Sequence, residues 1–170
     1  FSWEIKGQHM KRILLALTGV FFASIFSAPC FCADEVFKLG IIGTTTSHVP
    51  AFIKTINDPN AAEIFQGFEI VGAYPGGVPD NGDSWDRVRK YTKDCEDAGL
   101  TIYKTVEELV ANVDGILLES VDGRVHLEQA RPVIAAGKPL FVDKPLAGNL
   151  HDVLELYDLA EEADVPIFSC

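Results

Sequence analysis

The chain has 170 residues, of which 48% are hydrophobic, and a formal net charge of −11. This length is enough for one domain with a buried core. The acidic excess argues against a nucleic-acid partner and against an anionic membrane surface, because both are negatively charged. The four cysteines form no disulfide framework or metal-binding spacing, and the sequence predicts no metal site.

The first 33 residues have the order of a secretory signal peptide. Met10 is the only methionine, and Lys11 and Arg12 precede the apolar stretch 13–29. We expect translation to start at Met10, cleavage to occur at the end of this segment, and the product to be exported to the periplasm or the outside. The general secretory route is expected, because there is no twin arginine. An uncleaved membrane anchor is the less favoured alternative, because the stretch is short for a span.

From residue 37 onward, apolar runs alternate with segments of helical periodicity. Strands are expected at 37–42, 68–74, 101–103, 115–120 and 139–143, with a sixth beginning at 165. Helices are expected at 47–57, 84–99, 105–113, 125–138 and 149–164. This alternation predicts an α/β fold for residues 34–170, with a doubly wound, mainly parallel Rossmann-like sheet and helices on both faces.

Ligands bind such sheets at the carboxyl ends of the strands, and the turn after the first strand is the first candidate. Gly43 permits a tight turn, and hydroxyl and N–H groups follow it at a helix N-terminus, where an anion is favoured. These groups belong to Thr44, Thr45, Thr46 and Ser47. Ser47 is the expected N-cap. Thr45 and His48 replace the second and third glycines of G-x-G-x-x-G, and the Cβ of Thr45 is expected to obstruct a pyrophosphate. The alternative is an ordinary polar turn.

The second strand lacks the acid that usually holds the ribose hydroxyls of a dinucleotide. Tyr74 and Pro75 stand at its end, and the nearest acid is Asp80. A second determinant of dinucleotide binding is therefore missing.

The fourth strand ends in a group of polar and titratable residues: Glu119, Ser120, Asp122, Arg124 and His126. Buried strand ends seldom keep such groups without a partner. We expect Glu119, Ser120 and His126 to contact a cofactor, and the alternative is a solvated capping cluster.

The fifth strand ends in Asp143, Lys144 and Pro145. Pro145 stiffens the loop and keeps Lys144 out of a helix, and Asp143 can orient the ammonium. A lysine held in this way can act as an acid or base beside a nicotinamide, and we expect Asp143 and Pro145 to contact the cofactor. The alternative is an exposed turn lysine.

Four segments resemble the amino-terminal Rossmann domain of the Gfo/Idh/MocA oxidoreductases: 38–43, 113–120, 126–148 and 160–168. The most specific part is H-x-E…A-G-K-P-x-x-x-D-K-P. The resemblance implies binding of NAD or NADP and hydride transfer to or from a sugar, polyol or related hydroxyl compound. It implies that Lys144 is catalytic, and it matches Gly43, His126 and Asp143 to positions of the family.

The same resemblance implies a carboxy-terminal domain that supplies substrate and oligomer contacts. We therefore expect this sequence to be a fragment, and a homo-oligomer only for the full-length protein. The leading hypothesis is the nucleotide-binding domain of an NAD(P)-dependent oxidoreductase. The alternative is an exported, non-catalytic ligand-binding protein that kept the fold and lost the dinucleotide, because free NAD is scarce outside the cytoplasm.

Overall fold

The computed structural model describes residues 36–78, 80 and 82–170. The strands are β1 Phe37–Ile42, β2 Phe68–Tyr74, β3 Thr101–Ile102, β4 Gly115–Leu118, β5 Leu140–Val142 and β6 Ile167–Ser169. The α-helices are α2 His48–Ile56, α3 Gly82–Asp97, α4 Val106–Val110, α5 His126–Ala135 and α6 Leu150–Glu162. Two short 3₁₀ helices, η1 Glu63–Phe65 and η2 Gly123–Val125, were not expected from the sequence.

All six strands pair in parallel in one sheet, in the order β3-β2-β1-β4-β5-β6. The strand order reverses between β1 and β4, which makes this the switch point of a doubly wound sheet. The predicted fold class is therefore confirmed. Most elements are shorter than predicted, because pairing stops where the chain turns away from the sheet, whereas α3 begins two residues earlier than expected.

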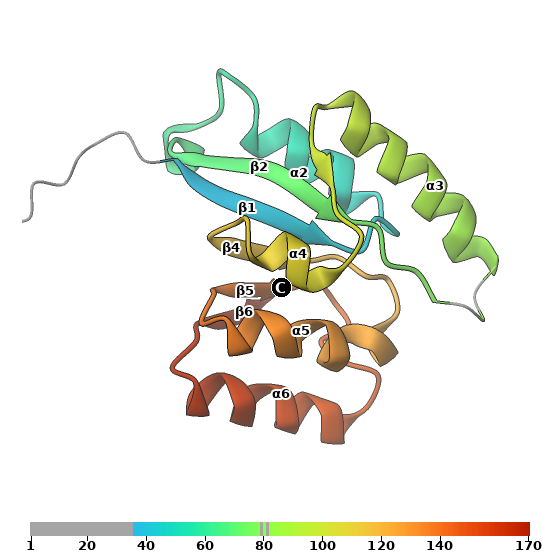
Figure 1. Ribbon diagram of the computed structural model, residues 1–170, viewed down its shortest axis with the longest axis vertical. Coiled ribbons are helices and arrows are strands. Elements are labelled where there is room, and N and C mark those ends of the chain that lie inside the picture. The colour runs from blue at the N-terminus through green and yellow to red at the C-terminus, as the bar shows by residue number, and fades with distance from the viewer. Residues whose placement is uncertain (1–35, 79, 81) are drawn as a thin grey trace, which may run out of the picture. The chain divides into compact units, whose positions relative to one another are not determined.

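Helices cover both faces of the sheet, with α2 and α3 on one side and α4, α5 and α6 on the other (Figure 1). Successive strand residues point to opposite faces. Ile41 of β1 accordingly packs in the cluster that contains Val49 and Cys95, whereas Ile42 packs with Leu118 in the other cluster. Full burial of each such side chain contributes about 1.5–3 kcal/mol.

The signal peptide predicted for residues 1–33 lies outside the described part of the chain. Among the residues that are described, no helix has the length and apolar character needed to cross a bilayer.

The register brings the ends of three strands to the same level. Ile42 pairs with Leu118, and Leu118 pairs with Val142. One residue further, Glu119 N donates to Ile42 O at 2.7 Å, and Asp143 N donates to Leu118 O at 2.9 Å. Three predicted site segments therefore meet at one edge of the sheet.

Candidate functional site

Gly43 is fixed by its conformation and by the close approach of the end of β4. Its φ is +90°, and a Cβ at this position would lie 2.3 Å from Ser120 Oγ and 2.6 Å from Ser120 N. Both features exclude a larger residue. A glycine is thus required here because the turn packs closely against Ser120. This packing is a different requirement from the close approach of a phosphate.

The three threonine hydroxyls that follow Gly43 are engaged inside the protein. Thr44 Oγ1 lies 2.7 Å from Thr92 Oγ1. Thr45 Oγ1 accepts from Val121 N at 2.8 Å and donates to Glu119 O at 3.3 Å, and Thr46 Oγ1 accepts from His48 N at 3.3 Å. Thr45, which the sequence placed against a pyrophosphate, has its side chain buried against the end of β4.

The backbone at the start of α2 keeps the donors expected for an anion. Ser47 is the N-cap residue of α2, as predicted, but its backbone has αR geometry and its side chain makes no capping hydrogen bond. No residue in the described part of the chain accepts a hydrogen bond from the backbone N–H groups of Thr45, Thr46 or Ser47. These groups and the positive end of the α2 dipole form a seat that suits a phosphate.

The loop after β2 lies directly on this turn. Pro75 O accepts from Thr44 N at 2.7 Å, and a Cβ on Gly76 would lie 3.2 Å from Gly43 Cα. Asp80, the nearest acid, makes two 3.0 Å hydrogen bonds with the guanidinium of Arg124. This contact lowers the pKa of Asp80, so the acid nearest to the end of β2 is already paired with Arg124.

The polar group at the end of β4 separates into distinct parts. Arg124 also binds Asp122, so these two residues form an ion cluster with Asp80, in which Arg124 and Asp80 are exposed and Asp122 is mostly buried. His126 is fully buried, with Nε2 2.6 Å from Ser120 O and Nδ1 3.3 Å from Leu146 O. Its ring therefore joins the loops after β4 and β5, and its contact with a cofactor stays a prediction.

Ser120 is also buried, and its Oγ donates to Gln129 Oε1 at 2.7 Å. Its hydroxyl is therefore engaged with α5, and its contact with a cofactor stays a prediction.

Glu119, Asp143 and His48 form a compact cluster at the switch point. His48 Nδ1 lies 2.8 Å from Asp143 Oδ2 and 3.8 Å from Glu119 Oε2. Glu119 is fully buried, and neither carboxyl oxygen has a hydrogen-bond partner among the described residues. Burial, together with the negative charge of Asp143, raises the pKa of Glu119 to about 8, against a smaller opposing effect of Lys144. Glu119 is therefore mostly protonated at neutral pH.

Lys144 is exposed directly after the buried Asp143. Asp143 Oδ1 accepts from the backbone N–H of Lys144 at 2.8 Å. The carboxylate thus fixes the backbone of Lys144, whereas the expected contact with its ammonium is not among the described ion pairs. Pro145 follows in a cis peptide and is also exposed.

Sequence reasoning missed His48 as a site residue, because it considered this position only as a replaced glycine. A histidine that opens a helix directly after a strand-end turn is the signal that could have identified it. Its partner, Asp143, is 95 residues away in the sequence.

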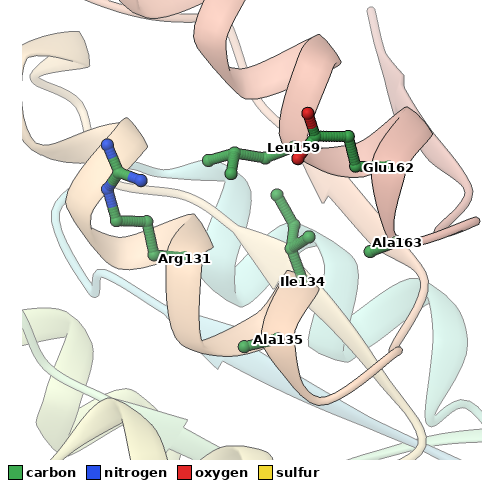
Figure 2. A pocket seen from close by; sticks show the side chains of 6 residues that line it. All are labelled: Arg131, Ile134, Ala135, Leu159, Glu162 and Ala163. Atoms are coloured by element: carbon green, nitrogen blue, oxygen red, sulfur yellow. The ribbon is translucent and has the colours of Figure 1, made fainter.

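A hollow of about 350 Å³ between α5 and α6 is a separate feature. Figure 2 shows Ile134 of α5 pointing toward Leu159 and Glu162 of α6. These residues belong to the second halves of the two helices, which run antiparallel to the strands and end near the opposite edge of the sheet. This hollow is therefore not part of the cluster at the carboxyl ends.

Three comparisons place this geometry among known proteins. The chain is 34% identical over 67 residues to an uncharacterized oxidoreductase of Synechocystis sp., across 38% of this chain and 18% of that protein. A dehydrogenase structure from Clostridium difficile matches with a TM-score of 0.59 and 25% identity, across 78% of this chain and 38% of that one. The scyllo-inositol dehydrogenase of Lactobacillus casei, with NAD(H) and scyllo-inositol bound, has the same fold at 18% identity and a TM-score of 0.56, across 79% of this chain and 36% of that one.

The chain thus spans less than two fifths of the length of these relatives. The model of the Gfo/Idh/MocA oxidoreductase family, described as an NAD-binding Rossmann fold, matches residues 37–169. Together with the six-stranded sheet and its switch point, this match shows that the chain belongs to the Gfo/Idh/MocA oxidoreductase family.

Proposed function

We propose that this chain forms the NAD(P)-binding domain of an oxidoreductase that transfers hydride between a nicotinamide cofactor and a hydroxyl group of a sugar, polyol or related compound. The observation that carries this proposal is the position of Lys144. It is exposed, follows the buried Asp143, and lies at the same edge of the sheet as the N-terminus of α2.

The start of α2 fits the phosphates of a dinucleotide. The backbone N–H groups of Thr45, Thr46 and Ser47 would donate to phosphate oxygens, supported by the helix dipole. The end of β2 fits less well, because Asp80 is paired with Arg124. Without a carboxylate for the ribose hydroxyls, this edge is compatible with the ribose of NAD and with the phosphorylated ribose of NADP.

A bound nicotinamide would supply the hydride donor or acceptor. The Lys144 ammonium would donate a hydrogen bond to the reacting oxygen of the substrate, and its Nζ would exchange the proton that the hydroxyl loses or gains. Asp143 holds this lysine through its backbone N–H. The polyol bound by the L. casei enzyme supports this substrate class.

Replacement of Lys144 in the full-length protein tests this function. Lys144→Ala should lower turnover by roughly 10²–10⁴-fold on the responsive member of a sugar and polyol panel, and should change cofactor affinity much less. Lys104 is a matched control, because it is also exposed and follows the end of a strand, β3. Lys104→Ala should leave turnover unchanged. Equal turnover in the wild type and in Lys144→Ala would exclude the proposed role.

An exported binding protein without a dinucleotide is the second candidate. It is favoured by the leader-like segment 10–33 and by the internal use of the Thr44 and Thr45 hydroxyls. Such a protein would bind a small ligand and would show no turnover with NAD or NADP on any member of the panel.

A further inference from the structure

The buried carboxyl group of Glu119 lacks a counterpart. It is completely shielded from solvent, and neither oxygen receives a hydrogen bond from any described residue. A buried carboxyl group without a partner is costly and uncommon in native proteins. The groups nearest to it are Asp143, which is also buried, and the half-exposed ring of His48.

The three side chains have the spacing of metal ligands. One atom from each of Glu119, Asp143 and His48 can be chosen so that all three lie within 4.8 Å of one another. Bonds of about 2.1 Å to one ion would place neighbouring ligand atoms about 3.0–3.4 Å apart. The distances from His48 Nδ1, 2.8 Å to Asp143 and 3.8 Å to Glu119, fall on either side of that range. Binding of one ion would therefore require the three side-chain tips to shift.

We propose that Glu119, Asp143 and His48 bind a divalent first-row transition metal ion at the switch point of the sheet. Glu119 would release its proton to solvent as the ion binds, so that two carboxylates balance the charge of the ion. The imidazole nitrogen favours such a metal over Mg²⁺ or Ca²⁺, which prefer oxygen ligands. His48 is 42% exposed, so the ion has a path from solvent and open positions for water or a ligand.

The surroundings hold the two carboxylates in place. The Asp143 oxygen that is not directed at His48 accepts from Lys144 N at 2.8 Å. Glu119 is fixed through its backbone, where Thr45 Oγ1 donates to its carbonyl and Ile42 accepts from its N–H. Such outer contacts orient metal ligands. The site therefore requires only that the three side-chain tips move.

A second cluster of the same composition provides the control. On α6, His151 Nδ1 lies 3.4 Å from Asp152 Oδ1 and 3.8 Å from Glu155 Oε2. His151 is 82% exposed, and this cluster contains no fully buried carboxyl group. The cluster around His48 thus differs from the cluster around His151 because it contains a buried carboxyl group without a hydrogen-bond partner in the described part of the chain.

The test is a calorimetric titration of chelator-treated, full-length protein with Mn²⁺, and separately with Zn²⁺, in the absence of dinucleotide. We expect one equivalent of metal to bind. Glu119→Gln, Asp143→Asn and His48→Ala should each weaken binding at least about 100-fold, which is the upper range for loss of an outer-shell contact. His151→Ala should bind as the wild type does. Thermal unfolding without metal verifies that each variant is folded. If the replacement of the buried Glu119 or Asp143 prevents folding, His48→Ala still tests the site, because His48 is partly exposed.

Three results would overturn the proposal. The first is that the wild type binds neither metal. The second is that the wild type and the folded ligand variants bind metal with equal affinity. The third is that the wild type binds only Zn²⁺ and that this binding is lost in Cys170→Ser. The last result would assign the ion to the thiol, whose Sγ lies 3.5 Å from Asp143 Oδ1. Because no dinucleotide is present, the outcome does not depend on the proposed oxidoreductase function.

Discussion

His48 Nδ1 lies 2.8 Å from Asp143 Oδ2, and this contact joins the start of α2 to the end of β5 across 95 residues of sequence. The same Asp143 carboxylate receives the backbone N–H of Lys144 through its other oxygen. The phosphate seat at the turn and the proposed catalytic lysine are therefore linked through one buried side chain.

Gly43→Ala should destabilise the protein more than Gly99→Ala. Both glycines have positive φ, +90° and +84°, but a Cβ on Gly43 would overlap Ser120, whereas a Cβ on Gly99 meets nothing within 4 Å. Gly99→Ala should lower the free energy of unfolding by about 1 kcal/mol through backbone strain, and Gly43→Ala by about 2 kcal/mol more through overlap. Urea unfolding measures both, and equal losses would contradict the packing explanation.

Thr45→Val should destabilise the protein by about 1–3 kcal/mol, because it leaves the partly buried N–H of Val121 without its acceptor. Thr45→Ser keeps the hydroxyl and should cost less than about 1 kcal/mol. Thermal unfolding of the two variants distinguishes this structural role from the ligand-facing role predicted from the sequence. If Thr45→Val is as stable as Thr45→Ser, the hydroxyl does not hold the turn to β4.

The stability of the metal-free protein should depend on pH through Glu119. The pKa of this group is raised from its ordinary value of 4.5 to about 8, so the folded state holds the proton more tightly than the unfolded state. Its contribution is fully present below pH about 4.5 and is lost as the pH rises through about 8, by roughly 5 kcal/mol.

Glu119→Gln cannot ionise and should remove that part of the pH dependence. Chelator-treated wild type and variant are compared by unfolding across this pH range, and the neighbouring side chains of His48, Asp143 and Lys144 are the same in both proteins. Parallel stability curves for the two proteins would show that Glu119 is ionised in the folded state.

The leader predicts export of the full-length protein. When it is expressed in a Gram-negative host, the protein should be recovered from the periplasm with an amino terminus near Asp34, whereas deletion of residues 13–29 should retain it in the cytoplasm. Amino-terminal sequencing gives the answer. A soluble cytoplasmic product that still begins at Met10 would contradict export.

The sequence was sufficient to predict the sheet and the edge where the candidate site lies. Apolar runs and turn residues are local signals, and they located every strand between 37 and 169 to within a few residues. The positions of Gly43, Glu119 and Asp143 at strand ends followed from the same pattern.

The contacts within the site could not be predicted, because they depend on side chains that are distant in the sequence. His126 and Glu119 are both polar residues near the end of β4, yet the structure gives one of them two carbonyl contacts and the other none. The pairing of His48 with Asp143 requires the register of β1, β4 and β5, which no local pattern encodes.

Equilibrium binding of NADH and NADPH to the full-length protein, followed by nicotinamide fluorescence, tests the central claim most directly. The account predicts saturable binding of at least one of them at one site per chain, and this binding should persist in Lys144→Ala. If neither dinucleotide binds to the folded wild-type protein, the chain is not a functional NAD(P)-binding domain, and the exported binding protein becomes the better description.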